Sequence, residues 1–342
     1  MERTEGVRSF VGIDAHSGHC SIKVISAAGE NLSELRVPTE VKRLRAALQG
    51  LAAPAWAMLE SSFLAGFVKD SIEREVARVI VCETRENRWI AKSEDKSDPK
   101  DADRLARLLR VGEFKEVYVP KGIGRDRREI LRMYGKAQGD VARTKNRIKG
   151  KYREHGIFPK GSKVFSPEHR GEWLEQLERP AIRQLVEALY EKLDRDVGFR
   201  DQVLEQLVEL MNGTKEYELL KTIPGVGKVL AGVMSALIGD ATRFAGKRQL
   251  WSYAGLGLFS RSSGDFGQSR VRGSSGGNRS LKHAALSAAT SSIRGANRFS
   301  RHYAKMVDEG IDPAMAKRTV ARQILATALA MLKRGQIYRE ES

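Results

Sequence analysis

Two acidic residues close apolar runs that have the length of buried strands. Asp14 ends the run SFVGI, and Glu60 ends the run Ala55 to Leu59. The carboxyl ends of parallel strands open to ligands at one edge of a sheet, so these two carboxylates converge if their strands are neighbours. Each acid taken alone is better explained as the point where a strand leaves the core.

Two further acids come from the segment SDPKDADRLARLL. Asp98 precedes Pro99, a pattern typical of a helix N-cap followed by proline at the first helical position. Asp101 lies about 60° around the predicted helix from Asp98, on the face that Ala102 continues toward the core. Asp103 lies about 200° from Asp101, so we expect it to point to solvent.

Four convergent carboxylates repel one another and raise each other's pKa unless cations are present. Hard oxygen ligands in that number suit Mg²⁺ or Mn²⁺, and two such ions about 4 Å apart can assist phosphodiester chemistry. The sequence therefore predicts a two-metal site formed by Asp14, Glu60, Asp98 and Asp101. His16 lies close enough in sequence to neighbour these metals, although an exposed role at a strand edge is the favoured interpretation.

A second candidate centre lies in the Gly/Ser/Arg-rich stretch 255–280, which we expect to form a flexible loop without regular elements. A serine in it could attack phosphorus and form a phosphoserine link that conserves bond energy for rejoining. Arginines of this stretch suit phosphate contact; they are Arg261, Arg270, Arg272 and Arg279. On composition alone a plain flexible basic loop is the favoured interpretation, and the nucleophile stays open among Ser260, Ser262, Ser263, Ser269, Ser274 and Ser275.

The segment TIPGVGKVL allows two interpretations. It is not a P-loop, because Thr222 replaces the first glycine and Val229 the final Ser/Thr of that motif. A tight turn through Gly225 and Gly227 before Lys228 exposes backbone N–H groups at a helix N-terminus, which can hold a DNA phosphate. A purely structural turn explains the segment equally well.

The elements that must position these residues differ along the chain. We expect residues 8–120 to form strands that alternate with helices. In chain order, the sequence predicts a strand, a hairpin turning at Gly29, a helix capped by Thr39 and ending at Leu51, two more strands, a helix, and a closing strand EVYVP. This order predicts an α/β, ribonuclease H-like domain over residues 1–122. Residues 123–217 read as long basic helices, packed either as a coiled coil or as a helical hairpin. Residues 218–342 form a mainly α-helical C-terminal domain that ends in an amphipathic helix.

The amino-acid composition and the net charge limit the kinds of partner that this chain can bind. The chain has 342 residues, of which 41% are hydrophobic, so sizeable cores form and wholesale disorder is excluded. Its formal net charge of +17 favours a polyanionic partner, since each Lys or Arg on a phosphate releases counterions. Cys20 and Cys82 read as buried thiols of a reducing compartment. We find no signal peptide and no apolar stretch long enough for a bilayer, which predicts a cytoplasmic, nucleoid-associated protein without a membrane partner.

The ordered set of motifs resembles one family. GIDAHSGHCSIKVIS, AMLESS and KSDPKDADRLARLL resemble the N-terminal RuvC-like domain of the IS-one-ten family of insertion-sequence transposases. LLKTIPGVGKVLAGVM, SSG and GGNRSLKHAALSAA resemble that family's C-terminal transposase domain. The resemblance covers roughly residues 9 to 338. The chain departs from the family pattern at Leu258, where proline is usual, and at Lys282, where arginine is common.

The resemblance implies a mechanism. The family's four metal-binding acids fall on Asp14, Glu60, Asp98 and Asp101, and its catalytic serine falls on Ser263, with Ser262 as the close rival. It further implies composite sites across the protomers of a dimer or tetramer. It also implies guidance by a bridge RNA that pairs with target and donor DNA.

Three hypotheses follow for the function. The first is an RNA-guided transposase or recombinase that cuts and rejoins DNA. The second is a RuvC-like nuclease or invertase that activates water and works without RNA. The third is a non-catalytic basic scaffold that coats nucleic acid. Metal-dependent cleavage separates the third from the others, and a covalent protein–DNA link separates the first from the second.

Overall fold

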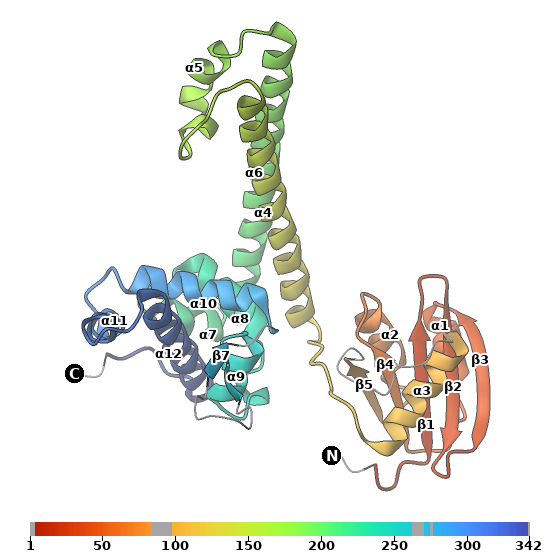
Figure 1. The fold of residues 1–342 in the computed structure, drawn as a ribbon. Coiled ribbons are helices and arrows are strands. Elements are labelled where there is room, and N and C mark those ends of the chain that lie inside the picture. Colours follow the sequence, from red (N-terminus) through yellow and green to blue (C-terminus); the bar gives the residue numbers. More distant parts are fainter. Residues whose placement is uncertain (1–3, 84–97, 262–269, 274–275, 341–342) are drawn as a thin grey trace. The chain divides into compact units, whose positions relative to one another are not determined.

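The computed structural model describes residues 4–83, 98–261, 270–273 and 276–340, and for residues 98, 99, 258–261 and 270–273 it describes the backbone alone. The chain folds into two compact units, Met1–Pro120 and Lys121–Ser342 (Figure 1). Within the described residues, no helix is both long enough and apolar enough to cross a membrane.

The first unit is built on a five-stranded mixed sheet in the order β3-β2-β1-β4-β5 (Figure 1). Its strands are β1 (Ser9–Ala15), β2 (His19–Ser26), β3 (Asn31–Pro38), β4 (Ala55–Glu60) and β5 (Arg78–Cys82). The first three are antiparallel neighbours, whereas β1, β4 and β5 run parallel to one another. The mixed sheet and the predicted hairpin turning at Gly29, whose φ is +90°, are therefore present.

Helices cover both faces of this sheet. α1 (Val41–Leu48) and α2 (Ala65–Ile72) pack on one face together with Val11 and Ile13 of β1. α3 (Asp98–Val111) packs on the other face, where its Leu105 and Leu109 meet Phe10. Successive strand residues point to opposite faces, which explains why the central strands read as continuous apolar runs.

Three local predictions in this unit were wrong. Thr39 does not cap α1, because its hydroxyl donates instead to the carbonyl of His16 at 2.7 Å and Glu40 takes the N-cap position. The helix ends at Leu48 rather than Leu51, just before Gly50 adopts a positive φ of +79°. The closing segment EVYVP forms an isolated bridge to Cys82 instead of a full strand.

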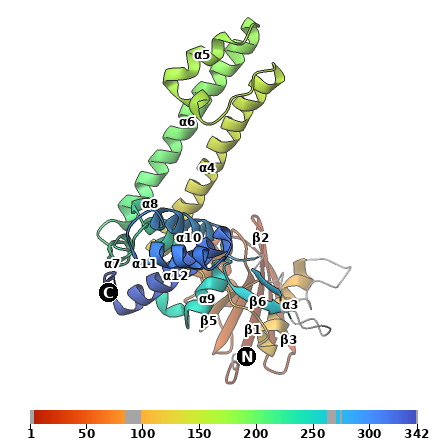
Figure 2. The same ribbon diagram turned by 60° about the vertical axis from the view of Figure 1, so that its left-hand side comes forward.

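The second unit begins with a helical hairpin. α4 (Ile123–Glu154) and α6 (Pro180–Met211) lie side by side in Figures 1 and 2. They run antiparallel, because Arg127 near the start of α4 donates to the Leu210 carbonyl at 3.0 Å, while Tyr152 near its end meets Tyr190 at 3.0 Å. Of the two packings predicted for this region, the described chain adopts the helical hairpin. Its connection holds three short helices, η2 (Lys163–Phe165), η3 (Pro167–His169) and α5 (Arg170–Glu175).

The hairpin is joined to a bundle of C-terminal helices around one apolar core. Arg128 of α4 donates to the carbonyls of Ala236 and Leu237, which belong to the last turn of α8. The bundle contains α7 (Lys215–Lys221), α8 (Lys228–Ile238), η4 (Ala241–Arg243), α9 (Lys247–Tyr253), α10 (Arg279–Ser292), α11 (Arg298–Asp308) and α12 (Pro313–Arg334). α12 ends in basic residues before Gly335 in the left-handed conformation, as its sequence predicts.

The expectation of an unstructured loop over 255–280 was also wrong. β6 (Leu258–Arg261) and β7 (Arg270–Gly273) form an antiparallel pair within it. The Gly and Ser content, averaged over the whole stretch, hid two short segments in which leucine, phenylalanine and valine favour extended backbone.

Candidate active site

Asp14 and Glu60 lie on the same face of the sheet, at the carboxyl ends of two neighbouring strands. β1 and β4 are parallel, with Ile13 in register with Leu59, so the two acids follow on adjacent strands at their carboxyl ends. Met58, two residues before Glu60, packs against α3. Because side chains alternate along a strand, both acids are on the α3-covered face.

The direction of α3 brings its first turn to the same edge. The guanidinium of Arg110, near the end of α3, donates to the carbonyl of Ala27 at 3.4 Å, and Ala27 lies in the turn beyond the amino end of β1. The helix therefore runs antiparallel to β1, and the backbone of Asp98 and Asp101 lies toward the carboxyl end of that strand. All four predicted metal ligands are thus placed at one edge, while their roles stay predictions.

Gly12 of β1 is the point where this helix touches the sheet. A Cβ at position 12 would lie 1.9 Å from the carbonyl oxygen of Ala102 and 2.5 Å from the amide nitrogen of Ala106. Only glycine permits so close an approach of two backbones. Gly12 therefore sets the height of α3 over the sheet.

Basic and aromatic groups surround Asp14. Its carboxylate meets the Nε2 of His16 at 3.0 Å, and its side chain is 16% exposed. His16 stacks on His19, with ring centroids 5.2 Å apart, and the guanidinium of Arg36 lies 3.0 Å from His19. The side chain of His16 is 46% exposed just beyond the end of β1, as the favoured interpretation of an exposed role at a strand edge expects.

Exposure does not separate Asp101 from Asp103, contrary to the expectation that only Asp103 faces solvent. Asp101 pairs with Arg104 at 3.1 Å and its side chain is 40% exposed, whereas Asp103 pairs with Arg107 at 2.7 Å and is 29% exposed. At 3.6 residues per turn the two acids lie about 80° and about 120° from the centre of the buried stripe, so they flank it on opposite sides. Ion pairing along the helix then covers each of them partly.

The carboxylate edge is bordered by a buried thiol. Cys82 is in register with Glu60 on β5. Burial, followed by the charge of Glu60, raises the pKa of Cys82 to about 12, so this thiol stays protonated. Among the side chains that the structure describes, which do not include that of Asp98, no group of three or more His, Cys, Asp or Glu is close enough to hold a metal ion.

The predicted serine centre lies in the connection between β6 and β7. Ser262 and Ser263 fall outside the described residues. Arg261, the last residue of β6, is in register with Arg270, the first residue of β7, so an arginine stands at each end of the connection. Arg272 is in register with Phe259. Arg279 is exposed in the first turn of α10.

Glycines hold the two ends of this stretch together. A Cβ at Gly277 would lie 2.4 Å from the amide nitrogen of Gly255, and both glycines have positive φ. Next to them, the amide of Asn278 donates to the carbonyl of Tyr253 at 2.7 Å, and its side chain caps α10 through the amide of Leu281. The described residues before and after the serine segment are therefore held close together by backbone contacts.

The Pro-Gly-Val-Gly turn has a structural half and an exposed half. Gly225 has φ +84°, and a Cβ there would lie 2.4 Å from the carbonyl oxygen of Ala288 in α10. Gly227 and Lys228, in contrast, are exposed at the N-terminus of α8, and nothing lies within 4 Å of a Cβ on Gly227. Both interpretations of the turn thus have a physical basis, each at a different residue.

Comparison with known proteins assigns the chain to a family. Residues 11–155 match a DEDD transposase model of the IS110 type, and residues 217–304 match the model described as transposase IS116/IS110/IS902 family. The chain belongs to this transposase family. It is thus a DNA transposase, and the family is the one that its motifs resemble.

Two relatives of the transposase extend the comparison. It is 25% identical, over an alignment 402 positions long, to "Insertion element IS110 uncharacterized 43.6 kDa protein" of Streptomyces coelicolor, covering 99% of the chain and 97% of the relative. It is 27% identical over 188 residues to "Putative transposase y4qE" of Sinorhizobium fredii, covering 52% of the chain and 45% of the relative.

Sequence reasoning missed the positioning role of Gly12 in this transposase. The signal was present, since a glycine inside a buried strand often marks the close approach of another backbone. The pairing of Gly255 with Gly277 across the serine segment was missed as well. Their 22-residue separation gives no local pattern that connects them.

Proposed function

We propose that the transposase cuts and rejoins DNA with two centres, a carboxylate metal site in a RuvC-like domain and a serine nucleophile in the C-terminal domain. One observation carries the proposal: the first turn of α3 lies at the sheet edge and face that hold Asp14 and Glu60. The sheet order, with three antiparallel strands followed by two parallel ones, supports the RuvC-like assignment.

The donor set fits hard divalent cations. Asp14, Glu60, Asp98 and Asp101 would supply the carboxylate oxygens that Mg²⁺ or Mn²⁺ prefers, and four acids match two ions. When bound, such ions stabilise the charge on the attacking and leaving oxygens of a phosphodiester exchange. Arg104 places a cation beside Asp101, which limits the repulsion among these acids.

The serine would carry the DNA strand between cutting and rejoining. The Ser263 hydroxyl, with Ser262 as the rival, attacks the scissile phosphorus and loses its proton, while the bond to the leaving oxygen breaks and that oxygen takes up a proton. A DNA hydroxyl then attacks the phosphoserine, which restores a phosphodiester and frees the serine. No nucleotide energy source is needed, because each exchange conserves one phosphoester bond.

Basic groups near this centre would hold the nucleic acid. Arg261, Arg270, Arg272 and Arg279 would contact phosphates, and the exposed amides at Gly227 with Lys228 would hold another phosphate, with Gly225 shaping the turn. Four exposed basic residues share one face of α4 and suit a guide RNA; they are Arg132, Lys136, Arg143 and Arg147. We extend the proposal to a bridge RNA, to a dimer or tetramer, and to association with the bacterial nucleoid.

The test uses purified full-length transposase with its co-purified RNA and a plasmid that carries the element ends and a target. We expect strand exchange in Mg²⁺, its loss in EDTA, its loss after ribonuclease treatment, and its loss in Asp14→Asn. Asp70→Asn, an exposed acid on the opposite side of the sheet, serves as the matched control and should keep activity. Ribonuclease-resistant nicking without exchange would replace the proposal by a nuclease, and binding without cleavage would replace it by a scaffold.

A further inference from the structure

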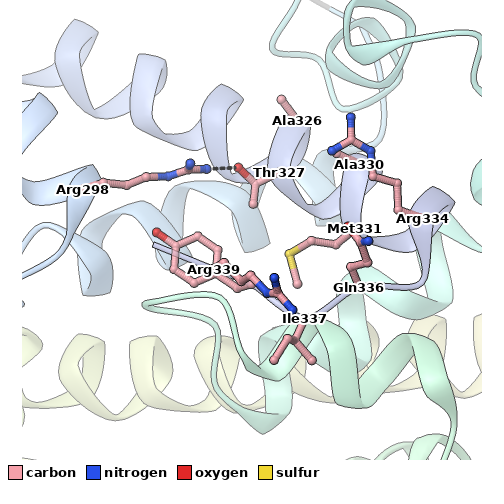
Figure 3. Close-up of a pocket in the computed structure, with 10 residues that line it drawn as sticks. Arg298, Ala326, Thr327, Ala330, Met331, Arg334, Gln336, Ile337 and Arg339 are labelled. Atoms are coloured by element: carbon pink, nitrogen blue, oxygen red, sulfur yellow. Dashed lines mark hydrogen bonds between the residues drawn. The ribbon is translucent and has the colours of Figure 1, made fainter. Parts of the chain in front are cut away.

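A basic cavity lies at the C-terminal end of the second unit, among residues that neither catalytic centre uses. It has a volume of about 460 Å³ and is formed by the start of α11, the second half of α12 and the residues after α12 (Figure 3). This volume is in the range of cavities that hold small organic ligands, about 300–1,000 Å³.

The cavity is built by a chain segment that folds back and is fixed at several points. After Gly335, whose amide donates to Met331 at 2.7 Å, the amide of Tyr338 donates to the hydroxyl of Thr222 at 3.0 Å. The ring of Tyr338 stacks on Phe299, with centroids 6.0 Å apart. The hollow between this segment and α12 is therefore a defined part of the fold.

The charged residues that line the cavity are all basic. Arg298, Arg334 and Arg339 come from three different segments and all line the cavity, and no acidic residue is among the described residues that line it (Figure 3). Arg298 is held in place by a 2.7 Å hydrogen bond to the hydroxyl of Thr327 and lies over the ring of Tyr338 at 5.2 Å. Three guanidinium groups around one hollow favour an anion, and their planar donors match phosphate.

The floor is apolar. Met331 is 6% exposed, and the exposed side chains of Ala330 and Ile337 add apolar surface to the lining. A ligand that contacts both the arginines and the apolar side chains of the cavity needs a phosphate joined to a flat, weakly polar group. A nucleotide has this composition, and a base can enter a hollow only when it is unpaired, because a duplex presents a convex backbone with stacked bases.

We propose that this cavity binds a nucleotide of a single-stranded nucleic acid, with its phosphate on Arg334 and Arg339 and its base on the apolar floor. The cavity shares no residue with the serine segment or with the four carboxylates, so the proposal does not depend on the catalytic mechanism. It gives the transposase a contact for an unpaired strand, whether of RNA or of DNA.

The test measures binding of fluorescent 12-nucleotide single strands of RNA and DNA to the full-length protein, by anisotropy at several salt concentrations. We expect Arg334→Ala/Arg339→Ala to lower the slope of log K against log salt by about 0.7, the contribution of the one phosphate on a single strand that these two arginines share. Ala330→Phe, which fills the hollow and keeps every charge, should also weaken binding, by about tenfold if a stacked base is excluded. The strand that loses more affinity identifies RNA or DNA as the source.

The matched control is Arg294→Ala/Arg318→Ala, which removes two exposed arginines outside the cavity. It should lose less affinity than the cavity variants, and all variants should keep the thermal midpoint of unfolding within a few degrees. An equal loss in the control, or unchanged binding by Ala330→Phe, would overturn the proposal by reducing the arginines to general surface charge. Adenosine or uridine monophosphate binding as tightly as a 12-mer would overturn the assignment to a strand.

Discussion

Gly12 of β1 and Ala102 of α3 touch through their backbones, and a Cβ at position 12 would lie 1.9 Å from the Ala102 carbonyl oxygen. This contact fixes the helix that carries Asp98 and Asp101 against the strand that carries Asp14. The geometry of the proposed metal site therefore depends on a residue without a side chain.

Gly12→Ala should lift α3 from the sheet. Neither partner of the clash is a flexible side chain, so the helix must move, at a cost of about 1–3 kcal/mol or more in the free energy of unfolding. Metal-dependent cleavage should fall further than stability, because the first turn of α3 moves away from Asp14 and Glu60. Gly18→Ala is the control, since nothing lies within 4 Å of a Cβ there. A fully active Gly12→Ala protein would contradict the role of this contact.

Asp101→Asn should remove a metal ligand and lower the cleavage rate by more than about 100-fold, given that even outer-shell partners of metal ligands are worth about 10–100-fold. Asp103→Asn should keep most of the activity, although its side chain is no more exposed than that of Asp101. The pair is informative because each substitution removes one charge and one ion pair with an arginine. Single-turnover cleavage at a range of Mn²⁺ concentrations measures both, and equal losses in folded proteins would remove Asp101 from the proposed set.

The Pro-Gly-Val-Gly turn allows folding and binding to be separated. Gly225→Ala should destabilise the second unit by about 2 kcal/mol or more, because the new methyl group meets the Ala288 carbonyl at a positive φ. Lys228→Ala should leave the thermal midpoint unchanged and reduce the salt slope of duplex DNA binding by about 0.9, as expected for one lost phosphate contact. A Lys228→Ala protein with an unaltered salt slope would leave the turn with a structural role alone.

The hairpin of α4 and α6 contains a buried polar contact that should respond to pH. The hydroxyl of Thr144, 1% exposed, donates to Asp196 at 2.6 Å, and Lys192 also donates to this carboxylate. Burial raises the pKa of Asp196, and the hydrogen bonds from Lys192 and Thr144 lower it by more, so its pKa lies below the ordinary value. A depressed pKa in the folded state stabilises the protein above the unfolded value of about 3.9, and this stabilisation is lost as the pH falls.

Thr144→Val should therefore lower the free energy of unfolding by about 1.5–3 kcal/mol at pH 7, the usual worth of a hydrogen bond to a charged group. The difference from wild type should shrink as the pH falls through the lowered pKa of Asp196 and its carboxylate becomes protonated. Thr144→Ser keeps the hydroxyl and should lose much less. Urea denaturation across this pH range measures the effect, and a difference that does not vary with pH would exclude Asp196 as its cause.

The sequence predicted the elements that depend on strong local patterns. The apolar runs that end at Asp14 and Glu60 became adjacent parallel strands, and the stripe of Ala102, Leu105 and Leu109 became the buried face of α3. These patterns can be recognised in a sequence because a strand or helix that faces a core carries apolar residues at regularly spaced positions.

The predictions that failed depended on competition between partners. The hydroxyl of Thr39 could either cap α1 or donate to the carbonyl of His16, and the tertiary structure determines which of these hydrogen bonds forms. The exposure of Asp103 depended on Arg107 one turn away, an ion pair that the angle alone does not reveal. The roles of the four acids rest on the family resemblance and on their placement, whereas the role of Ser263 rests on the resemblance alone.

The most direct test of the central claim is a trap for covalent protein–DNA adducts in cells that carry the gene with its native flanking sequence. Wild type would be compared with Ser263→Ala, with Ser262→Ala as the matched control. The account predicts an adduct in wild type and in Ser262→Ala, and none in Ser263→Ala, while all three proteins are present at equal levels. An adduct that persists in Ser263→Ala, or recombination by wild type without any adduct, would contradict strand exchange through this serine.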